Sequence, residues 1–287
     1  MRMLLVLLIS CLFSGCLVDA HIKSNKEQDG LQGSVRTVRV EKTLCSKVGT
    51  NISEGQGSRE VSQVTYNVKG NKTEEAKYGV DGSLISRSIF TYDAAEQLIE
   101  VKVQNADDSI SLKRAYKHIP SRDGKKVEEA VFKDGTTLLT KAVSVYDQKG
   151  RVIELATYDP SGIPSIKQII SYDASGQLIE IDYYQGNNSL MGKSVFLYDT
   201  HGTLKEKIDY SAAGPQSGRT VFSKEVKEEE RVDVSEYDAD SNLLKRETYV
   251  RKFDSHGNWI KETTSKWNSI TNAFEPLAVT YRTIAYY

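Results

Sequence analysis

A short motif that returns at regular spacing is the feature that most constrains the fold. Each full copy begins with Tyr-Asp, carries two variable residues and then in most copies Gly, and continues into an apolar run; these copies start at Tyr92, Tyr146, Tyr172 and Tyr198. Shorter versions start at Tyr158, Tyr237 and Phe253. The starts at 146, 172 and 198 are 26 residues apart, and 158 lies near a midpoint, so the elementary unit is about 13 residues.

Each unit predicts a strand, a turn and a second strand. The aspartate opens the turn because its side chain can bond to the following backbone, and glycine supplies the left-handed conformation of a bulged hairpin loop. After the turn at Tyr172 the chain alternates: Ile179, Ile181 and Tyr183 lie on one face, and Leu178, Glu180, Asp182 and Tyr184 on the other. The first face is the drier one, so we expect it to be covered.

The number of units predicts a sheet that cannot stay open and flat. Residues 34–287 hold on the order of 20 such strands, whereas twisted open sheets rarely exceed about 10. We therefore expect an all-β fold in which tandem β-hairpin repeats form a curled antiparallel meander, either a spiral or a half-barrel, with the drier face inward. The predicted order is a signal peptide at 1–15, a flexible polar tether at 16–33 and one β domain at 34–287.

The tandem motif resembles the YD repeats of bacterial rearrangement-hotspot proteins, and the whole chain is similar to a small lipoprotein that carries such repeats. The resemblance covers about residues 60–265, and residues 281–287 resemble the closing strand of these lipoproteins. In large members the repeats build a hollow shell around a toxic domain. This chain is too short to enclose a domain, so the resemblance implies repeat architecture and sugar binding rather than toxin delivery.

The amino terminus predicts export. A charged start at Arg2, an apolar run over residues 3–13 and small residues before Cys16 form a secretory signal, and a run of about 11 residues is shorter than the roughly 18 that span a bilayer. Residues 13–16 resemble a bacterial lipobox, which implies a lipid anchor at Cys16 in the cell envelope. The alternative is a plain signal peptide that is cut after Ala20, which would make the protein secreted. Beyond Cys16 only Cys45 remains, so we expect no internal disulfide.

Charge and composition exclude some functions. Lys and Arg number 38 against 39 Asp and Glu, so the chain has no basic excess with which to neutralise nucleic-acid phosphates. Asp-x-His occurs at His201 and His256, but other copies of the turn hold Ala, Lys, Ser or Asp at that position, so we interpret both histidines as solvated turn residues. The repeat aspartates are interpreted as turn openers. We expect no catalytic residue, metal site or cofactor.

Tyrosine pairs are the remaining candidates for a binding surface. Consecutive strand residues point to opposite faces, so one tyrosine of each pair should face outward. The candidates are Tyr183, Tyr184, Tyr286 and Tyr287. The sequence thus favours a non-catalytic envelope lipoprotein that acts as a binding or structural platform for glycan or protein. The alternatives are a cell-wall or glycan-active enzyme and a repeat protein associated with polymorphic toxins.

Overall fold

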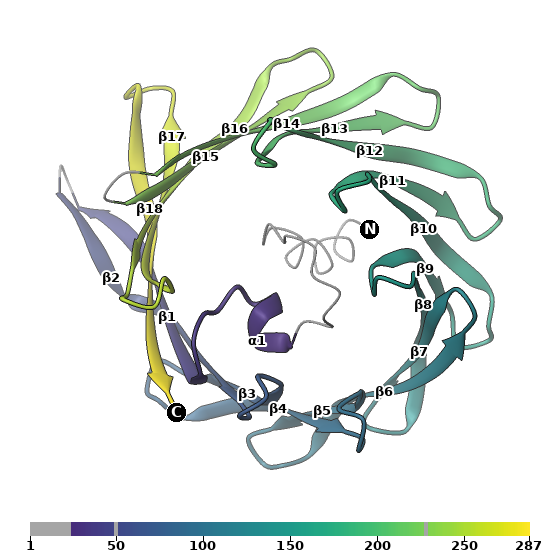
Figure 1. Cartoon of the computed structure of the whole chain (residues 1–287). Coiled ribbons are helices and arrows are strands. Elements are labelled where there is room, and N and C mark those ends of the chain that lie inside the picture. Colours follow the sequence, from purple (N-terminus) through teal and green to yellow (C-terminus); the bar gives the residue numbers. More distant parts are fainter. Residues whose placement is uncertain (1–23, 49–50, 227–228) are drawn as a thin grey trace.

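The structure, a computed structural model, describes residues 24–48, 51–226 and 229–287. A one-turn helix, α1 (Asn25–Gln28), precedes a sheet of eighteen strands within these residues. Every strand is antiparallel to the strands before and after it in sequence. Seen end-on, the strands form a ring that surrounds α1 (Figure 1). The predicted signal peptide and Cys16 lie outside the described residues.

The first nine strands form the amino-terminal half of the sheet. They are β1 (Val35–Val48), β2 (Asn51–Tyr66), β3 (Lys72–Tyr78), β4 (Leu84–Tyr92), β5 (Leu98–Asn105), β6 (Ile110–Ser121), β7 (Gly124–Lys133), β8 (Thr137–Tyr146) and β9 (Val152–Tyr158). The other nine complete the ring. They are β10 (Pro164–Tyr172), β11 (Leu178–Gln185), β12 (Leu190–Tyr198), β13 (Leu204–Ser211), β14 (Gln216–Val226), β15 (Glu230–Asp238), β16 (Leu243–Phe253), β17 (Trp259–Asn268) and β18 (Ala273–Tyr286).

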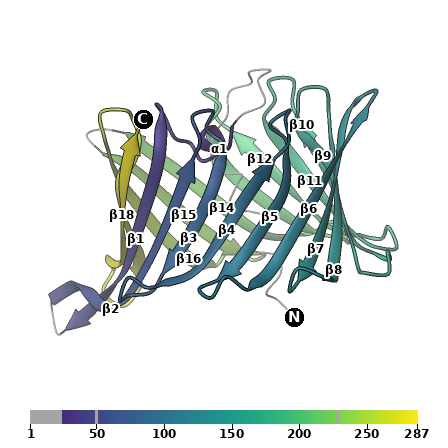
Figure 2. The same ribbon diagram turned by 90° about the horizontal axis from the view of Figure 1, so that it is seen from below.

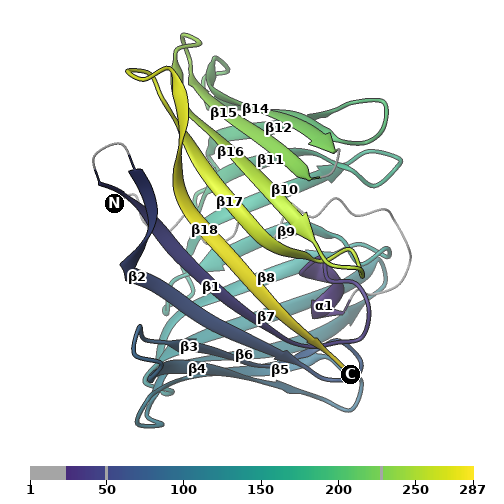
Figure 3. The same ribbon diagram turned by 90° about the vertical axis from the view of Figure 1, so that its left-hand side faces the viewer.

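The sheet closes on itself. β1 pairs with β2 on one side and with β18 on the other, with Val40 opposite Arg282 in the last ladder (Figure 3). The all-β meander is as predicted, but the expected open spiral or half-barrel is wrong, because the first and last strands pair and leave no free edge. Closure satisfies backbone groups that an open edge would expose. The motif predicts neighbouring hairpins, whereas the β1–β18 pairing joins the two ends of the chain and has no local signal.

The repeat turns have the predicted chemistry. In the turn after Tyr172, the Asp173 carboxylate accepts a bond from the Gln177 amide at 2.8 Å, and Gly176 has φ +91°. The corresponding glycines 150, 202 and 257 are also left-handed. Asp93, Asp147, Asp159, Asp199, Asp238 and Asp254 each accept from backbone amides in the same way. These carboxylates therefore hold the turns, as the motif predicts.

Register divides the wall into an inner and an outer face. Tyr92 donates to the Asn25 side chain of α1, so its face is the inner one. Because residues opposite each other in a ladder share a face, the assignment continues from strand to strand around the ring. Ile181 and Tyr183 face inward, while Glu180, Asp182 and Tyr184 face outward. The drier face is turned inward, as predicted.

The barrel is wide. Eighteen strands give a bore too wide for side chains to fill, since barrels of about 16–18 strands enclose water. Among the described residues, most wall positions are only partly buried, on both faces. Figure 2 shows the strands slanting between two rims, with α1 near one of them.

The left-handed turn residues generate a stability prediction. Gly176→Val places a β-branched side chain at φ +91° and should destabilise the protein by about 1–2 kcal/mol. Ala174→Val in the same turn is the control and should cost much less. Thermal or urea unfolding of the two variants measures the difference. Equal unfolding midpoints would show that the turn conformation is not the one described.

Candidate binding surface on the inner wall

One part of the inner wall is uncharged. We call the inward positions of β8–β12 the neutral arc: Thr140, Ala142, Ser144, Tyr146, Leu155, Thr157, Ile166, Gln168, Ile170, Tyr172, Ile181, Tyr183, Gln185, Gly192, Ser194, Phe196 and Tyr198. None of these described positions carries a charge. The outer face of the same strands carries six charged side chains: Lys141, Glu154, Lys167, Glu180, Asp182 and Lys193. The alternation of each strand separates the two kinds of residue.

The repeat tyrosines of the inner face are fixed by their hydroxyl groups. Tyr172 donates to the carbonyl of Val152 at 2.9 Å, and Tyr198 donates to the carbonyl of Leu178 at 2.8 Å. Tyr92 makes the same contact with Lys72. In each case the acceptor lies twenty residues earlier, at the start of the preceding strand. The bond ties the ring against the wall, so side-chain entropy is already restricted before any ligand arrives.

Sequence reasoning missed that His118 occupies a place in this row. It lies 26 residues after Tyr92, and its Nε2 contacts the Leu98 carbonyl at 2.7 Å, twenty residues back. Since a carbonyl only accepts, Nε2 carries the proton. His118 therefore replaces a repeat tyrosine. The 26-residue spacing was the signal that identifies it, although the Tyr-Asp letters are absent.

Tyr183 lies within the neutral arc. Its hydroxyl is 3.3 Å from Oγ of the buried Ser194, which donates to the Asp209 carboxylate at 2.5 Å. Gly192 lies directly opposite Tyr183 in the β11–β12 ladder and places no side chain beside the ring on that strand. An aromatic ring beside hydroxyl and amide groups suits a ligand that presents both apolar faces and hydroxyl groups.

Tyr184 lies on the other face. Its ring faces outward, with the Lys167 ammonium 5.6 Å from the ring centroid. The prediction that Tyr183 and Tyr184 point to opposite faces is therefore confirmed. The two residues share a strand and a side-chain type but differ in the surface that they present.

Beyond the neutral arc, the inner wall carries charged side chains from β13 to β18. The inward charged side chains there include Lys207, Asp209, Glu236, Lys245, Glu247, Arg251, Glu262, Lys266 and Arg282. Glu247 is 7% exposed. Burial by itself would raise the pKa of Glu247, but the hydrogen bond from Tyr249 and the Lys245 ammonium outweigh burial and hold that pKa below its usual range. These contacts favour the charged form of Glu247.

Tyr286 and Tyr287 lie at the seam between the two ends of the chain, away from β11. Tyr286 donates to Asp254 at 2.5 Å and stacks on His256 with centroids 4.1 Å apart. Tyr287 donates to the Tyr66 carbonyl at 2.6 Å. Their hydroxyl groups are used in closing the barrel, so the structure does not bring the two predicted pairs together.

The seam also binds the segment that follows α1. Asn258 is 2% exposed; its amide donates to the Gln32 carbonyl at 3.0 Å and to the Tyr286 hydroxyl at 2.8 Å, and its oxygen accepts from the Gln32 amide at 2.7 Å. Leu31, Val35, Val38 and Tyr66 form a buried cluster beneath. Residues 24–33, expected within a flexible tether, are thus docked on the inner wall, because these contacts offset the entropy of ordering them.

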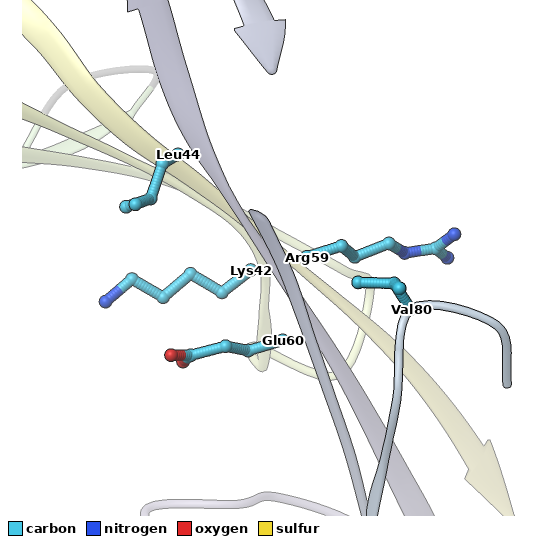
Figure 4. A pocket seen from close by; sticks show the side chains of 5 residues that line it. All are labelled: Lys42, Leu44, Arg59, Glu60 and Val80. Atoms are coloured by element: carbon cyan, nitrogen blue, oxygen red, sulfur yellow. The ribbon is translucent and has the colours of Figure 1, made fainter. Parts of the chain in front are cut away.

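A small surface pocket lies between β1 and β2, toward the end of the barrel away from α1. Lys42, Leu44 and Glu60 line it on one side of the strands, and Arg59 and Val80 lie on the other side (Figure 4). Lys42 and Glu60 are direct ladder partners, and Arg59 pairs with Glu41. The pocket thus holds one ion-paired arginine and two neighbouring side chains of opposite charge, and we assign no site here.

Among the described residues, no group of three or more His, Cys, Asp or Glu side chains is arranged to hold a metal ion. His201 and His256 are both exposed in their turns. Within the same part of the chain, none of the helical structure is long and apolar enough to cross a bilayer.

Comparison with known proteins yields structural resemblance alone. No known protein family and no curated protein matches the chain. A porin-like protein from Bacteroides uniformis aligns over 88% of this chain and 99% of its own, at 9% identity and a TM-score of 0.47. A porin-like protein from Bacteroides vulgatus aligns over 89% and 99%, at 10% identity and a TM-score of 0.31. The TcdB2–TccC3–Cdc42 complex aligns over 82% of this chain and 18% of its own, at 8% identity and a TM-score of 0.26.

The seam predicts a position-specific loss of stability. Asn258→Ala removes three hydrogen bonds of a side chain that is 2% exposed, two to the Gln32 backbone and one to Tyr286, which should cost about 1–3 kcal/mol in the free energy of unfolding. Asn242 holds the same position in its own turn but is exposed and bonds only to Asp238, so Asn242→Ala is the matched control. Urea unfolding of both variants measures the difference. Comparable losses would show that the seam contacts do not stabilise the barrel.

Proposed function

We propose that the protein is a non-catalytic binding shell of the bacterial cell envelope, and that the neutral arc of its inner wall holds the ligand. The observation that carries the proposal is the separation of residue types on β8–β12, where the inner face is uncharged and aromatic and the outer face is charged. In water, an outer charged face keeps the shell hydrated, while the inner face offers apolar area to a ligand.

A pore through a bilayer is the second candidate, because a closed barrel of this strand number resembles porins in outline. The outer wall argues against it. A membrane barrel needs an outward apolar band about 25 Å tall, and Lys or Arg in that band costs about 2–4 kcal/mol at the bilayer midplane. Lys141, Lys167 and Lys193 all face outward on neighbouring hairpins. We therefore propose a shell that binds its ligand rather than a wall that faces lipid.

Glycan is the ligand class that the neutral arc favours. Tyrosine and phenylalanine rings offer faces for stacking on sugar rings, and Ser, Thr and Gln offer neutral hydrogen-bond groups. Ser144, Gln168 and Thr157 lie on the same face as Tyr183 and its neighbours and are partly exposed. An extended polypeptide is the alternative ligand. The resemblance to YD-repeat proteins, which are described as sugar-binding, agrees with glycan and belongs to the same proposal.

The binding proposal is tested with Tyr183→Ala and Tyr184→Ala. A screen of bacterial glycans and envelope proteins supplies a ligand, and titration calorimetry on the protein lacking residues 1–16 compares the variants. Tyr183→Ala should weaken binding about tenfold, which corresponds to about 1.4 kcal/mol of lost stacking. Tyr184→Ala should leave the affinity within about twofold, since its ring lies outside.

The same experiment has contrary outcomes. A larger loss from Tyr184→Ala would place binding on the outer wall. Release of soluble products from peptidoglycan or polysaccharide would favour the enzyme alternative instead.

The envelope part of the proposal rests on the signal layout. Acylation at Cys16 would hold the shell at a membrane through several acyl chains, each buried methylene contributing about 0.8 kcal/mol. Cys16→Ser should therefore release the protein from the membrane fraction, as measured by fractionation and immunoblotting. A mature wild-type protein that is unmodified and begins at His21 would contradict the anchor.

A further inference from the structure

The inner wall holds an arginine, Arg282, whose charged neighbours are paired with other residues. Arg282 lies on β18, directly opposite the inward residue Val40 of β1. Its guanidinium carbon is 3.6 Å from the ring centroid of Trp259, and its Nε is buried without a hydrogen-bond partner. Among the residues that the structure describes, Arg282 makes no ion pair. The aromatic contact is its principal support.

The neighbouring acids are already engaged. Glu262 accepts from Arg251 at 2.7 Å, and Glu230 contacts both Arg251 at 3.2 Å and Lys224 at 2.6 Å. On the side of α1, Asp29 contacts Lys72 at 3.0 Å and accepts from Tyr66 at 2.6 Å. Each acid thus has a nearer cation than Arg282.

An unpaired, partly buried guanidinium is unfavourable unless something compensates it. Burial lowers the pKa of Arg282 to about 10, against the attraction of Asp29 and Glu262. At neutral pH the group still carries its charge, and a partly dry environment strengthens its attraction for an anion. The planar fork of arginine matches a carboxylate with two parallel hydrogen bonds. The Trp259 ring holds the plane of the guanidinium, because arginine stacks on aromatic faces.

We propose that Arg282 and Trp259 form a carboxylate-binding point on the inner wall, which takes the acid group of an acidic glycan. This inference rests on the proposed function and narrows its ligand class. β18 lies across the ring from β9–β11 (Figure 1), so a ligand that touches both the neutral arc and Arg282 has to be a chain of several sugars. The ligand is then an extended acidic polysaccharide rather than a single sugar.

The probe is an oligogalacturonate, compared with its methyl ester, which keeps the sugar rings and removes the charge. Calorimetry measures the binding of each form to the protein lacking residues 1–16. Wild type should bind the acid form at least tenfold more tightly than the ester. Arg282→Gln should abolish that preference, and Arg282→Lys should restore part of it, since lysine keeps the charge but not the fork.

Arg246→Gln is the matched control. Arg246 lies 5.4 Å from the Trp267 ring centroid on the outer wall, and it should be dispensable for the preference. If Arg282→Gln does not fold, the wild-type melting temperature supplies a second readout: sodium glucuronate should raise it more than glucose, and more than sodium chloride at equal ionic strength. A chloride effect equal to that of glucuronate would overturn the assignment to a sugar carboxylate.

Failure of this inference and failure of the proposed function are distinguishable. Equal binding of the acid and the ester by wild type, both weakened by Tyr183→Ala, would overturn the role of Arg282 and leave the glycan shell in place. Equal loss of the preference in Arg282→Gln and Arg246→Gln would also overturn it. Binding of neither form by wild type would count against the inference, and failure of the wider glycan screen would count against the proposed function.

Discussion

The antiparallel pairing of β1 with β18 is the contact on which the rest of the structure depends. Each hairpin brings its own local hydrogen bonds, but a meander of hairpins leaves two open edges and no defined inside. Pairing the first strand with the last removes both edges and fixes which face is enclosed. The buried cluster of Leu31, Val35, Val38 and Tyr66 lies at this seam. Apolar packing thus stabilises the one strand pairing that no hairpin turn holds together.

Closure explains why one alternating pattern produces two different surfaces. Once the ring is formed, the same period-two pattern that puts Lys193 outside puts Ser194 inside. The outer wall then carries rows of ion pairs such as Lys193 with Glu180, whereas the neutral arc carries rings and hydroxyl groups. The binding chemistry that we propose is therefore a consequence of topology, because no single hairpin could present an enclosed aromatic face.

The sequence predicts what is local and misses what is distant. The roles of Asp173 and Gly176 follow from turn chemistry, and the opposite orientations of Tyr183 and Tyr184 follow from strand alternation. Three features join residues that are far apart in the chain or lie outside the repeat: the closure, the docking of Gln32 on Asn258 and the contact of Arg282 with Trp259. The repeat spacing therefore does not predict them. His118 is an intermediate case, since its position fits the spacing although its side chain departs from the motif.

The two-strand repeat also limits how such a barrel can change in size. Inserting or deleting one 26-residue unit adds or removes two strands, so the end strands would still meet antiparallel and the seam could form. A change of one half-unit would bring them together parallel, and the seam contacts of Tyr286 and Asn258 would be lost. Because neighbouring strands lie about 4.8 Å apart, the circumference can evolve only in steps of about 10 Å. The number of repeats thus sets the diameter of the barrel in large steps, and the size of the ligand in related barrels should vary in the same steps.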